Sequence, residues 1–328
     1  AQCLVGSEMC IRDRRKAEQA LCTGAHLGCR LWFASGVPSP EQAPTPEAKH
    51  LAEQAQLQAD RNRAYYAKNR ALHRSVVLRL TEQIRNCILV HQQPNARIAR
   101  SGALDPERVW RAPLLNDSRV FRCAEEENQP SFTVDLLLDA SASRLHCQEV
   151  IAAQGTILAQ SLTACGIPVR VSSFCSLRGY TVLRVLKGFA DKSLQGIDQY
   201  FASGWNRDGL ALRAAGDLVS FDPGPAPRHL LILLTDASPN DSRRVPPSPE
   251  QPLGCDYGGS YGVDDAAAEV RTLRRKGLRV SAVFMGEDSS SHDAERIYGK
   301  NLARIRGMDQ LARAAGRLIQ NEIRELGD

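Results

Sequence analysis

The second half of the chain alternates short apolar segments with longer segments of helical periodicity. Residues 132–138 (FTVDLLL), 229–235 (HLLILLT) and 278–284 have the length and composition of buried strands, and 168–174 and 180–186 predict two more, joined by a turn. Helical patterns lie at 148–165, 209–220, 264–276 and 308–326. Continuous apolar strands that alternate with helices predict an α/β fold, a doubly wound and mainly parallel sheet with helices on both faces.

This sheet is expected to be preceded by a helical N-terminal extension. Apolar residues recur every four positions from Leu72 to Ile88, which predicts one long helix over 46–88. Residues 47–130 are therefore expected to be a helical extension and connecting segment, followed by the α/β domain at 131–328. Five arginines on this helix form either a solvated basic face or a docking surface for an acidic partner: Arg63, Arg70, Arg74, Arg79 and Arg85.

The first residues are expected to contribute little to the fold. Residues 36–46 (GVPSPEQAPTP) have the composition of a linker, so we interpret 15–46 as a poorly structured segment and proline-rich linker. Residues 3–14 (CLVGSEMCIRDR) resemble a translated sequencing adapter, and we interpret 1–14 as a non-native, adapter-derived segment. The natural protein is then expected to extend further upstream.

Composition narrows the class of protein. With 43% hydrophobic and 24% charged residues, the chain of 328 residues is typical of a globular protein. Its longest apolar runs, such as 230–234, fall far short of the roughly 20 residues that span a bilayer, which excludes membrane insertion. A net charge of +5, without a basic stripe interleaved with aromatic residues, predicts no nucleic-acid partner.

The cysteines point to a reducing compartment. All ten lie outside C-x-x-C pairs, which favours reduced thiols in a cytoplasmic protein over a disulfide framework. Cys22 and Cys29 near His26 are a zinc candidate, but no second ligand pair follows at the spacing of a zinc finger. Zinc is therefore not expected at these residues.

Polar residues follow the predicted strands where a ligand site of an open α/β sheet is expected, beyond the carboxyl ends of the strands. A D-x-S-x-S run follows residues 132–138, an Asp follows residues 229–235, and a polar loop at 204–209 lies between them. Carboxylate, hydroxyl and amide oxygens suit a hard divalent cation, Mg²⁺ or Mn²⁺, with an open position for an acidic side chain of a partner. The candidate metal ligands are Asp139, Ser141, Ser143, Asn206 and Asp236.

This pattern resembles the metal-ion-dependent adhesion site of von Willebrand factor A domains, over residues 132–326. By that resemblance Asp139, Ser141 and Ser143 are ligands from the first loop, and Asp236 is the ligand from the last loop. The family places a threonine in the middle loop, three residues before a glycine that opens a helix. Here that position holds Asn206, and the resemblance leaves open whether Asn206 or Asp208 is the middle ligand.

Further segments are similar to the A domains of bacterial NorD proteins, the nitric oxide reductase activation proteins, and more loosely to the CobT subunit of cobaltochelatase. They are 100–105 (RSGALD), 206–209 (NRDG), 234–241 (LTDASPND) and 257–265 (YGGSYGVDD). The resemblance implies a non-catalytic adaptor that works with a MoxR-type AAA+ ATPase to activate, or load metal into, a client metalloenzyme. The alternative is a chelatase subunit that inserts cobalt or magnesium into a tetrapyrrole.

Other interpretations remain. Asp139 and Asp236 would, without a metal, be ordinary loop caps. A phosphatase of the haloacid-dehalogenase type needs a second Asp where this chain has Ser141, so that activity is not expected. The chain has no P-loop, so ATP hydrolysis is assigned to the partner. Residues 242–255 are expected to be an exposed, proline-rich insertion relative to NorD proteins.

Overall fold

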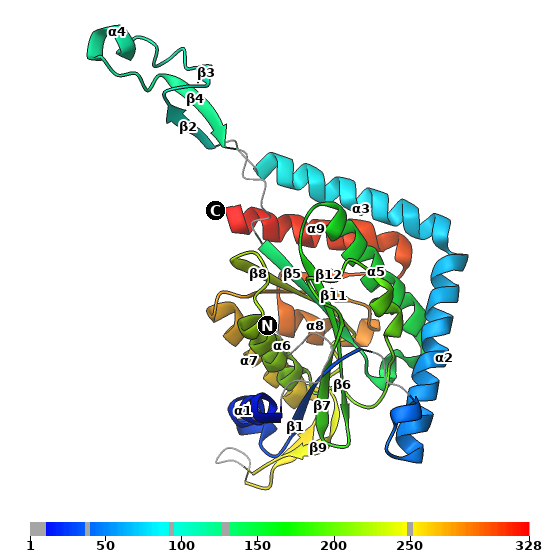
Figure 1. Ribbon diagram of the computed structural model, residues 1–328. Coiled ribbons are helices and arrows are strands. Elements are labelled where there is room, and N and C mark those ends of the chain that lie inside the picture. Colours follow the sequence, from blue (N-terminus) through cyan, green and yellow to red (C-terminus); the bar gives the residue numbers. More distant parts are fainter. Residues whose placement is uncertain (1–10, 37–39, 92–94, 126–131, 248–251, 328) are drawn as a thin grey trace.

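A mainly parallel sheet of seven strands forms the centre of the molecule, in the order β1-β7-β6-β5-β8-β11-β12 (Figure 1). The computed structural model describes residues 11–36, 40–91, 95–125, 132–247 and 252–327. The buried strand β5 pairs in parallel with β6 and β8, whereas β7 pairs antiparallel with β6 and in parallel with β1, so β7 and β1 run opposite to the other five strands. The strands are β1 (Arg30–Ser35), β5 (Phe132–Asp139), β6 (Val169–Leu177), β7 (Tyr180–Lys187), β8 (Arg228–Thr235), β11 (Arg279–Phe284) and β12 (Leu302–Arg304).

Helices cover both faces of this sheet, because the side chains of each central strand alternate between two apolar faces. Leu136 and Leu138 of β5 pack with α3, α5 and α9, whereas Leu137 packs with α1, α6, α7 and α8. The predicted doubly wound α/β fold is thereby confirmed. These helices are α1 (Ile11–Leu21), α3 (Arg70–His91), α5 (Gln148–Ala164), α6 (Asp208–Phe221), α7 (Gly259–Arg275), α8 (Ser291–Tyr298) and α9 (Met308–Gly327).

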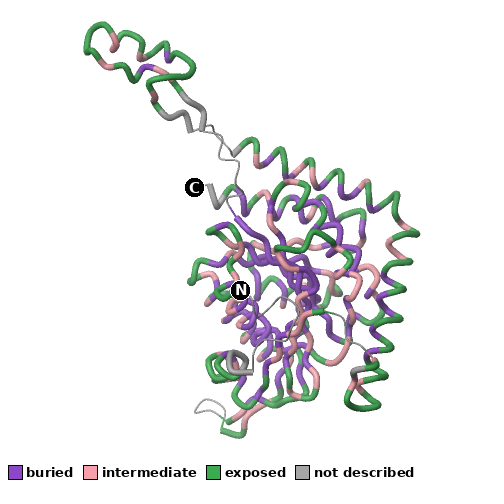
Figure 2. Tube along the Cα trace, viewed as in Figure 1, coloured by how far each residue is buried: buried purple, intermediate pink, exposed green. Residues whose placement is uncertain are grey.

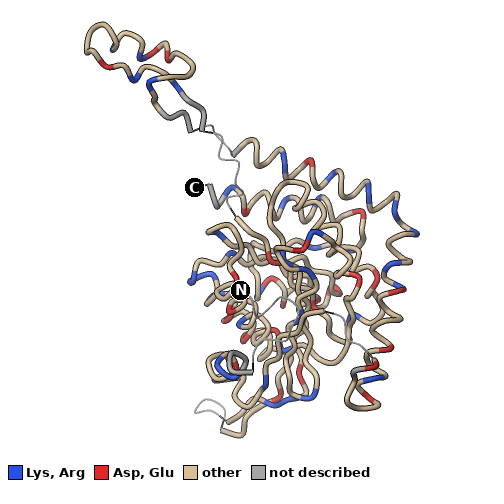
Figure 3. Tube along the Cα trace, in the orientation of Figure 1, with Lys and Arg blue, Asp and Glu red and all other residues tan. Residues whose placement is uncertain are grey.

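The long helix predicted over 46–88 is two helices. α2 (Pro46–Lys68) ends at Asn69, whose side-chain amide donates to the carbonyl oxygen of Tyr65 at 3.0 Å, and α3 begins at Arg70. The break lets α2 pack on α5 while α3 packs on α9 and α5. The predicted apolar stripe of α3 is buried at Val76, Leu80 and Ile84, and Figure 3 shows basic residues along the outer side of this helix.

Residues 15–46 differ most from the expectation. Instead of a poorly structured segment, they contain most of α1 and the edge strand β1, which pairs in parallel with β7 from Arg30–Tyr180 to Ser35–Val185. Leu31 and Phe33 of β1 are buried in the core. The proline-rich composition after residue 36 concealed the short alternating strand before it. Of the expected adapter-derived segment, residues 1–10 lie outside the described residues, and 11–14 begin α1.

Two smaller sheets lie outside the central one. β2 (Asn95–Ala99), β3 (Ala103–Leu104) and β4 (Phe121–Glu125) form an antiparallel sheet with the short helix α4 (Arg111–Leu115), within the segment predicted to be a helical extension and connection. Figure 2 shows that the residues of this lobe are mostly exposed, in contrast to the buried residues around β5 and β8 of the central sheet. Its strands were not predicted because they are short and lack a regular alternation of apolar residues.

The predicted insertion at 242–255 lies within a hairpin of β9 (Asp241–Val245) and β10 (Cys255–Tyr257). Ser242, Arg243 and Arg244 are exposed, in line with an outward excursion, but Asp241 and Tyr257 at its base are buried. Across all described helices, none combines the length and the hydropathy that crossing a bilayer requires.

Candidate metal centre

The first loop of the site begins where β5 ends. Asp139 is fully buried, and the backbone N–H of Ser141 donates to its Oδ1 at 2.9 Å. The hydroxyl of Thr235, at the end of β8, donates to the other carboxylate oxygen at 3.4 Å. The hydroxyl of Tyr200 donates to the main-chain carbonyl of Asp139. The loop and the neighbouring strand therefore hold this carboxylate in one orientation.

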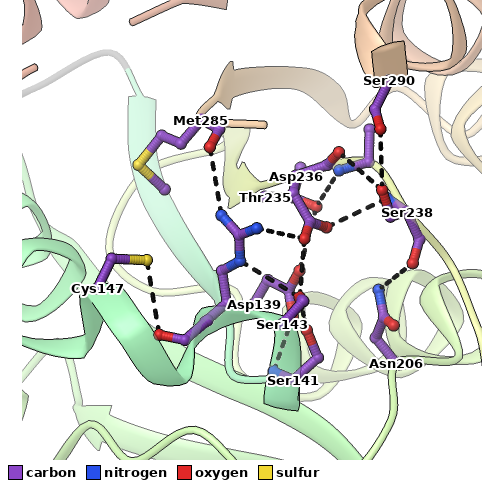
Figure 4. A network of polar contacts seen from close by, with 12 residues as sticks. Asp139, Ser141, Ser143, Cys147, Asn206, Thr235, Asp236, Ser238, Met285 and Ser290 are labelled. Carbon is purple, nitrogen blue, oxygen red and sulfur yellow. Dashed lines mark hydrogen bonds and ion pairs between the residues drawn. The ribbon is translucent and has the colours of Figure 1, made fainter. Parts of the chain in front are cut away.

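The two serines connect the first loop to the last. The hydroxyl oxygens of Ser141 and Ser143 lie 2.8 Å apart, and the Ser143 hydroxyl group donates to Oδ2 of Asp236 at 2.7 Å (Figure 4). The other oxygen of Asp236 accepts from the backbone N–H of Ser238 at 3.2 Å. Ala237, between these two residues, has φ +54°, a region that residues other than glycine rarely occupy. Four of the five predicted ligands are thus brought together.

The middle loop carries Asn206 and Asp208, which have different surroundings. The amide oxygen of Asn206 accepts from the N–H of Asn240 at 3.3 Å, and its nitrogen donates to Ser238 and to Asp208 Oδ1 at 3.1 and 3.0 Å. Asp208 is fully buried, and its Oδ2 has no hydrogen-bond partner in the described part of the chain. A buried carboxylate oxygen without a donor is costly unless a cation or a proton neutralises it. Asp208 Oδ2 is therefore open to a cation, whereas the amide oxygen of Asn206 already accepts a hydrogen bond.

Burial and the repulsion of neighbouring carboxylates make Asp139 and Asp208 resist ionisation. Burial, followed by the charge of Asp236, raises the pKa of Asp139 to about 7. Burial raises the pKa of Asp208 well above its ordinary value, and the charges of Asp139 and Asp236 raise it further. A divalent cation would remove this repulsion, and the oxygen ligands are those that Mg²⁺ and Mn²⁺ prefer. The residues present therefore fit such an ion.

Arg144 is a member of the site that the sequence analysis missed. Its guanidinium donates to Asp236 Oδ2, to the hydroxyl oxygen of Ser143 at 3.3 Å and to the carbonyl oxygen of Met285 at 3.3 Å. The side chain is buried, so its charge acts in a poorly screened environment. In the sequence, Arg144 is marked only by its position directly after the D-x-S-x-S run. That position does not indicate whether the side chain points into the site or into solvent.

The buried side chain of Arg207 anchors the middle loop to two neighbouring segments. The Arg207 guanidinium donates to Asp241 Oδ2 at 2.9 Å and to His26 Nδ1 at 3.0 Å, and it lies 4.1 Å from the ring centre of Tyr257. The loop also depends on Gly204, whose φ is +67° and where an added Cβ would lie 2.3 Å from a backbone oxygen of Ser176. The segment before β1 and the β9–β10 hairpin thus both support the loop that carries Asp208.

His26 lies near Asp265 and Glu269, so it has the surroundings of a second metal site. However, its Nδ1 accepts a hydrogen bond from Arg207, so its proton is on Nε2, which faces Asp265 Oδ2 at 3.4 Å. Burial and the charges of Arg213 and Arg207 lower the pKa of His26 to about 2. With Nδ1 engaged by Arg207 and Nε2 protonated, His26 has no free lone pair for a metal.

Residues 258–262 (GGSYG) have the G-x-S-x-G spacing of a serine-hydrolase elbow, which the sequence analysis did not identify. In such an elbow the serine occupies a strained strand-to-helix turn. Here the positive φ of +52° belongs to Gly259, and Ser260 lies exposed in the first turn of α7. The pentapeptide is therefore a glycine-rich helix start rather than a nucleophile elbow.

Comparison with known proteins gives one sequence relative and several structural neighbours. No family model matches the chain. Protein NorD of Brucella suis biovar 1 (strain 1330) is 26% identical over 141 residues, which are 42% of this chain and 20% of that protein. The matched region therefore spans about a fifth of the relative's length.

Similar solved structures include the von Willebrand factor domain of the type V pili tip protein Mfa5 from Porphyromonas gingivalis. The similarity covers 60% of this chain and 97% of that chain, with a TM-score of 0.43 and 10% sequence identity. Another is the manganese-loaded TRAP protein of Plasmodium vivax, with a TM-score of 0.40 and 14% identity over 59% and 74% of the two chains. The chain thus has a doubly wound sheet with polar loop residues at its carboxyl edge, and it resembles NorD in sequence over 42% of its length.

Proposed function

We propose that this protein binds a divalent cation, Mg²⁺ or Mn²⁺, at the carboxyl edge of its sheet and uses it to bind a partner protein. The ligands would be Asp139, Ser141, Ser143, Asp208 and Asp236. The observation that carries this proposal is the buried Asp208 Oδ2, which has no donor among the described residues and shares its surroundings with two other carboxylates. A bound ion would supply an electrophilic position for a carboxylate of the partner.

The surface around the site suits a protein ligand. Ser143 is exposed, so the cluster reaches solvent at this point. Leu145 and Trp205, close to it in the first and middle loops, are 52% and 45% exposed. Large apolar side chains around a polar contact exclude water on binding and strengthen the contact. A partner would therefore present an acidic side chain flanked by apolar residues.

The similarity to NorD supports a role in which this module is the adaptor of a MoxR-type AAA+ ATPase. In this role the protein is cytoplasmic and non-catalytic, and it directs the ATPase to a client metalloenzyme that is activated or loaded with metal. Between a NorD-like role and a CobT-like role, we favour the NorD-like one, activation of a nitric oxide reductase, because the sequence comparison matches a NorD protein.

Calorimetric titration of the full chain with Mg²⁺ and with Mn²⁺ tests the metal site. Asp139→Ala should abolish binding and Asp208→Asn should weaken it about tenfold or more, while the circular dichroism spectrum stays that of the wild type. Asp217→Asn is the matched control, because this residue lies toward the other end of α6 from Asp208. Absence of binding by the wild-type protein at millimolar metal, or unchanged binding by Asp208→Asn, would refute the proposed site.

A further inference from the structure

Arg144 contacts two of the residues that would bind the metal. Its guanidinium donates to Oδ2 of Asp236 and, at 3.3 Å, to the hydroxyl of Ser143. The same Asp236 oxygen also accepts from Ser143 at 2.7 Å. The lone pairs that a cation would use on Asp236 Oδ2 and Ser143 Oγ are therefore already engaged by hydrogen-bond donors.

The position of Arg144 has an electrostatic reason. Asp139, Asp208 and Asp236 are all at least 96% buried, with exposed fractions of 0%, 0% and 4%. Buried carboxylates of like charge need a counter-charge, and a guanidinium is suited to that role because it stays protonated and binds carboxylates directionally. Arg144 itself is 6% exposed, so it is fixed in the cluster rather than lying over it in solvent.

We propose that Arg144 is an internal cation that competes with the divalent metal for Asp236 Oδ2 and Ser143 Oγ, and thereby sets the metal affinity of the site. This inference rests on the proposed function. In the metal-free protein Arg144 neutralises part of the buried negative charge and keeps the first and last loops together. Metal binding requires the guanidinium to leave Asp236, and the lost contact subtracts from the affinity.

A purely structural role for Arg144 predicts the opposite result. If Arg144 only held Ser143 and Asp236 in place, its removal would disorder two ligands and weaken metal binding. Competition instead predicts that removal strengthens metal binding while it destabilises the metal-free protein. A gain of affinity cannot come from damage to the fold, so the two roles are separated by the direction of the change.

The test is calorimetric titration of the full chain with Mg²⁺ and Mn²⁺, using the wild type, Arg144→Gln and Arg144→Lys. We expect Arg144→Gln to bind about tenfold more tightly, as expected for loss of one hydrogen bond to a charged group, and Arg144→Lys to lie between it and the wild type. Arg275→Gln, an exposed arginine whose guanidinium donates to Thr272 in the same helix, controls for the change in net charge. Thermal unfolding in EDTA should show a lower Tm for Arg144→Gln, and added Mg²⁺ should raise its Tm more than that of the wild type.

Each outcome decides a different point. Equal or weaker metal binding by Arg144→Gln, with binding by the wild type, would overturn the competition and leave the proposed function standing. Binding by Arg144→Gln but not by the wild type would support the competition and refute a metal-dependent function of the natural protein. Binding by neither would overturn both. If Arg144→Gln does not fold, a gain of affinity in Arg144→Lys supports the competition and its absence overturns it.

Discussion

Ser143 donates a hydrogen bond to Oδ2 of Asp236 at 2.7 Å, although 93 positions separate the two residues in the chain. Their proximity follows from the sheet. Leu138 of β5 pairs with Leu234 of β8 in parallel register, so the loops that leave the two strands start side by side at the same edge. Any parallel pair of adjacent strands brings its following loops together in this way, and here both loops carry oxygen ligands.

Asp208 rather than Asn206 should be the ligand from the middle loop. Asp208→Asn removes the unpartnered carboxylate oxygen, and we expect metal affinity to fall about tenfold or more, since the lost contact is with a charged group. Asn206→Ala removes only contacts to Ser238, Asn240 and Asp208, and should weaken binding less. Calorimetry on both variants makes the comparison. A larger loss in Asn206→Ala would assign the ligand to the asparagine.

Ionisation of Asp139 should lower the stability of the metal-free protein as the pH rises from about 4 to about 7. Burial and Asp236 raise the pKa of Asp139 from 3.8 to about 7, so over this interval the folded state binds more protons than the unfolded state. The Asp139 contribution to stability therefore falls with increasing pH, and Asp208, whose pKa is also raised, adds to the fall, while Arg144 opposes it by neutralising charge. The lowered pKa of His26 contributes the opposite slope, so the effect of Asp139 is the difference between the wild type and a variant without this carboxylate.

Urea unfolding in EDTA at a series of pH values measures this effect. Relative to the wild type, Asp139→Asn should gain stability as the pH rises, because the amide does not ionise, and Mg²⁺ should shift the wild-type profile in the same direction by binding the ionised carboxylates. Profiles of the wild type and Asp139→Asn that run parallel between pH 4 and pH 7 would contradict the prediction.

Arg207→Ala should destabilise the protein strongly. The arginine is fully buried and pairs with the buried Asp241, so its removal leaves an uncompensated charge, at a cost of about 3–5 kcal/mol. Arg244→Ala is the matched control, because Arg244 and its partner Asp256 are both exposed, and the expected loss is about 0–1 kcal/mol. Urea unfolding measures both, and similar losses would show that the Arg207 contacts have no special weight.

Binding of the partner should depend on the metal. We expect EDTA to dissociate a complex with a MoxR-type ATPase and Mg²⁺ to restore it, while Trp205→Ala weakens the complex without changing metal affinity. The arginines of α3 offer a rival surface, since Arg70, Arg74, Arg79 and Arg85 are exposed (Figure 3). That surface predicts sensitivity to salt and none to EDTA. Titration of binding in EDTA and in Mg²⁺, each at two salt concentrations, separates the two surfaces.

Local patterns were enough to predict the central architecture. Residues 136–138 and 230–234 are apolar on both faces of their strands, and only a strand covered by helices on both sides buries all of these side chains. Asp139, Ser141, Ser143 and Asp236 were predictable as a cluster for the same reason, because each lies just beyond the carboxyl end of such a strand. Nothing beyond strand order was needed to place them at one edge.

Three features of the structure depended on long-range contacts and were not predictable from local patterns: the edge strand β1, the roles of the middle-loop residues and the position of Arg144. Residues 30–35 became part of the sheet because β7 offered a free edge, and a strand of this length with two buried apolar residues carries too weak a local signal to be recognised. The choice between Asn206 and Asp208 depended on Asn240 and Ser238, which occupy the polar groups of the asparagine and leave a carboxylate oxygen of Asp208 without a donor. Arg144 entered the site because three buried carboxylates, brought together from separate loops, require a positive charge. Burial and charge balance are properties of the assembled chain, so no local pattern around these residues could reveal them.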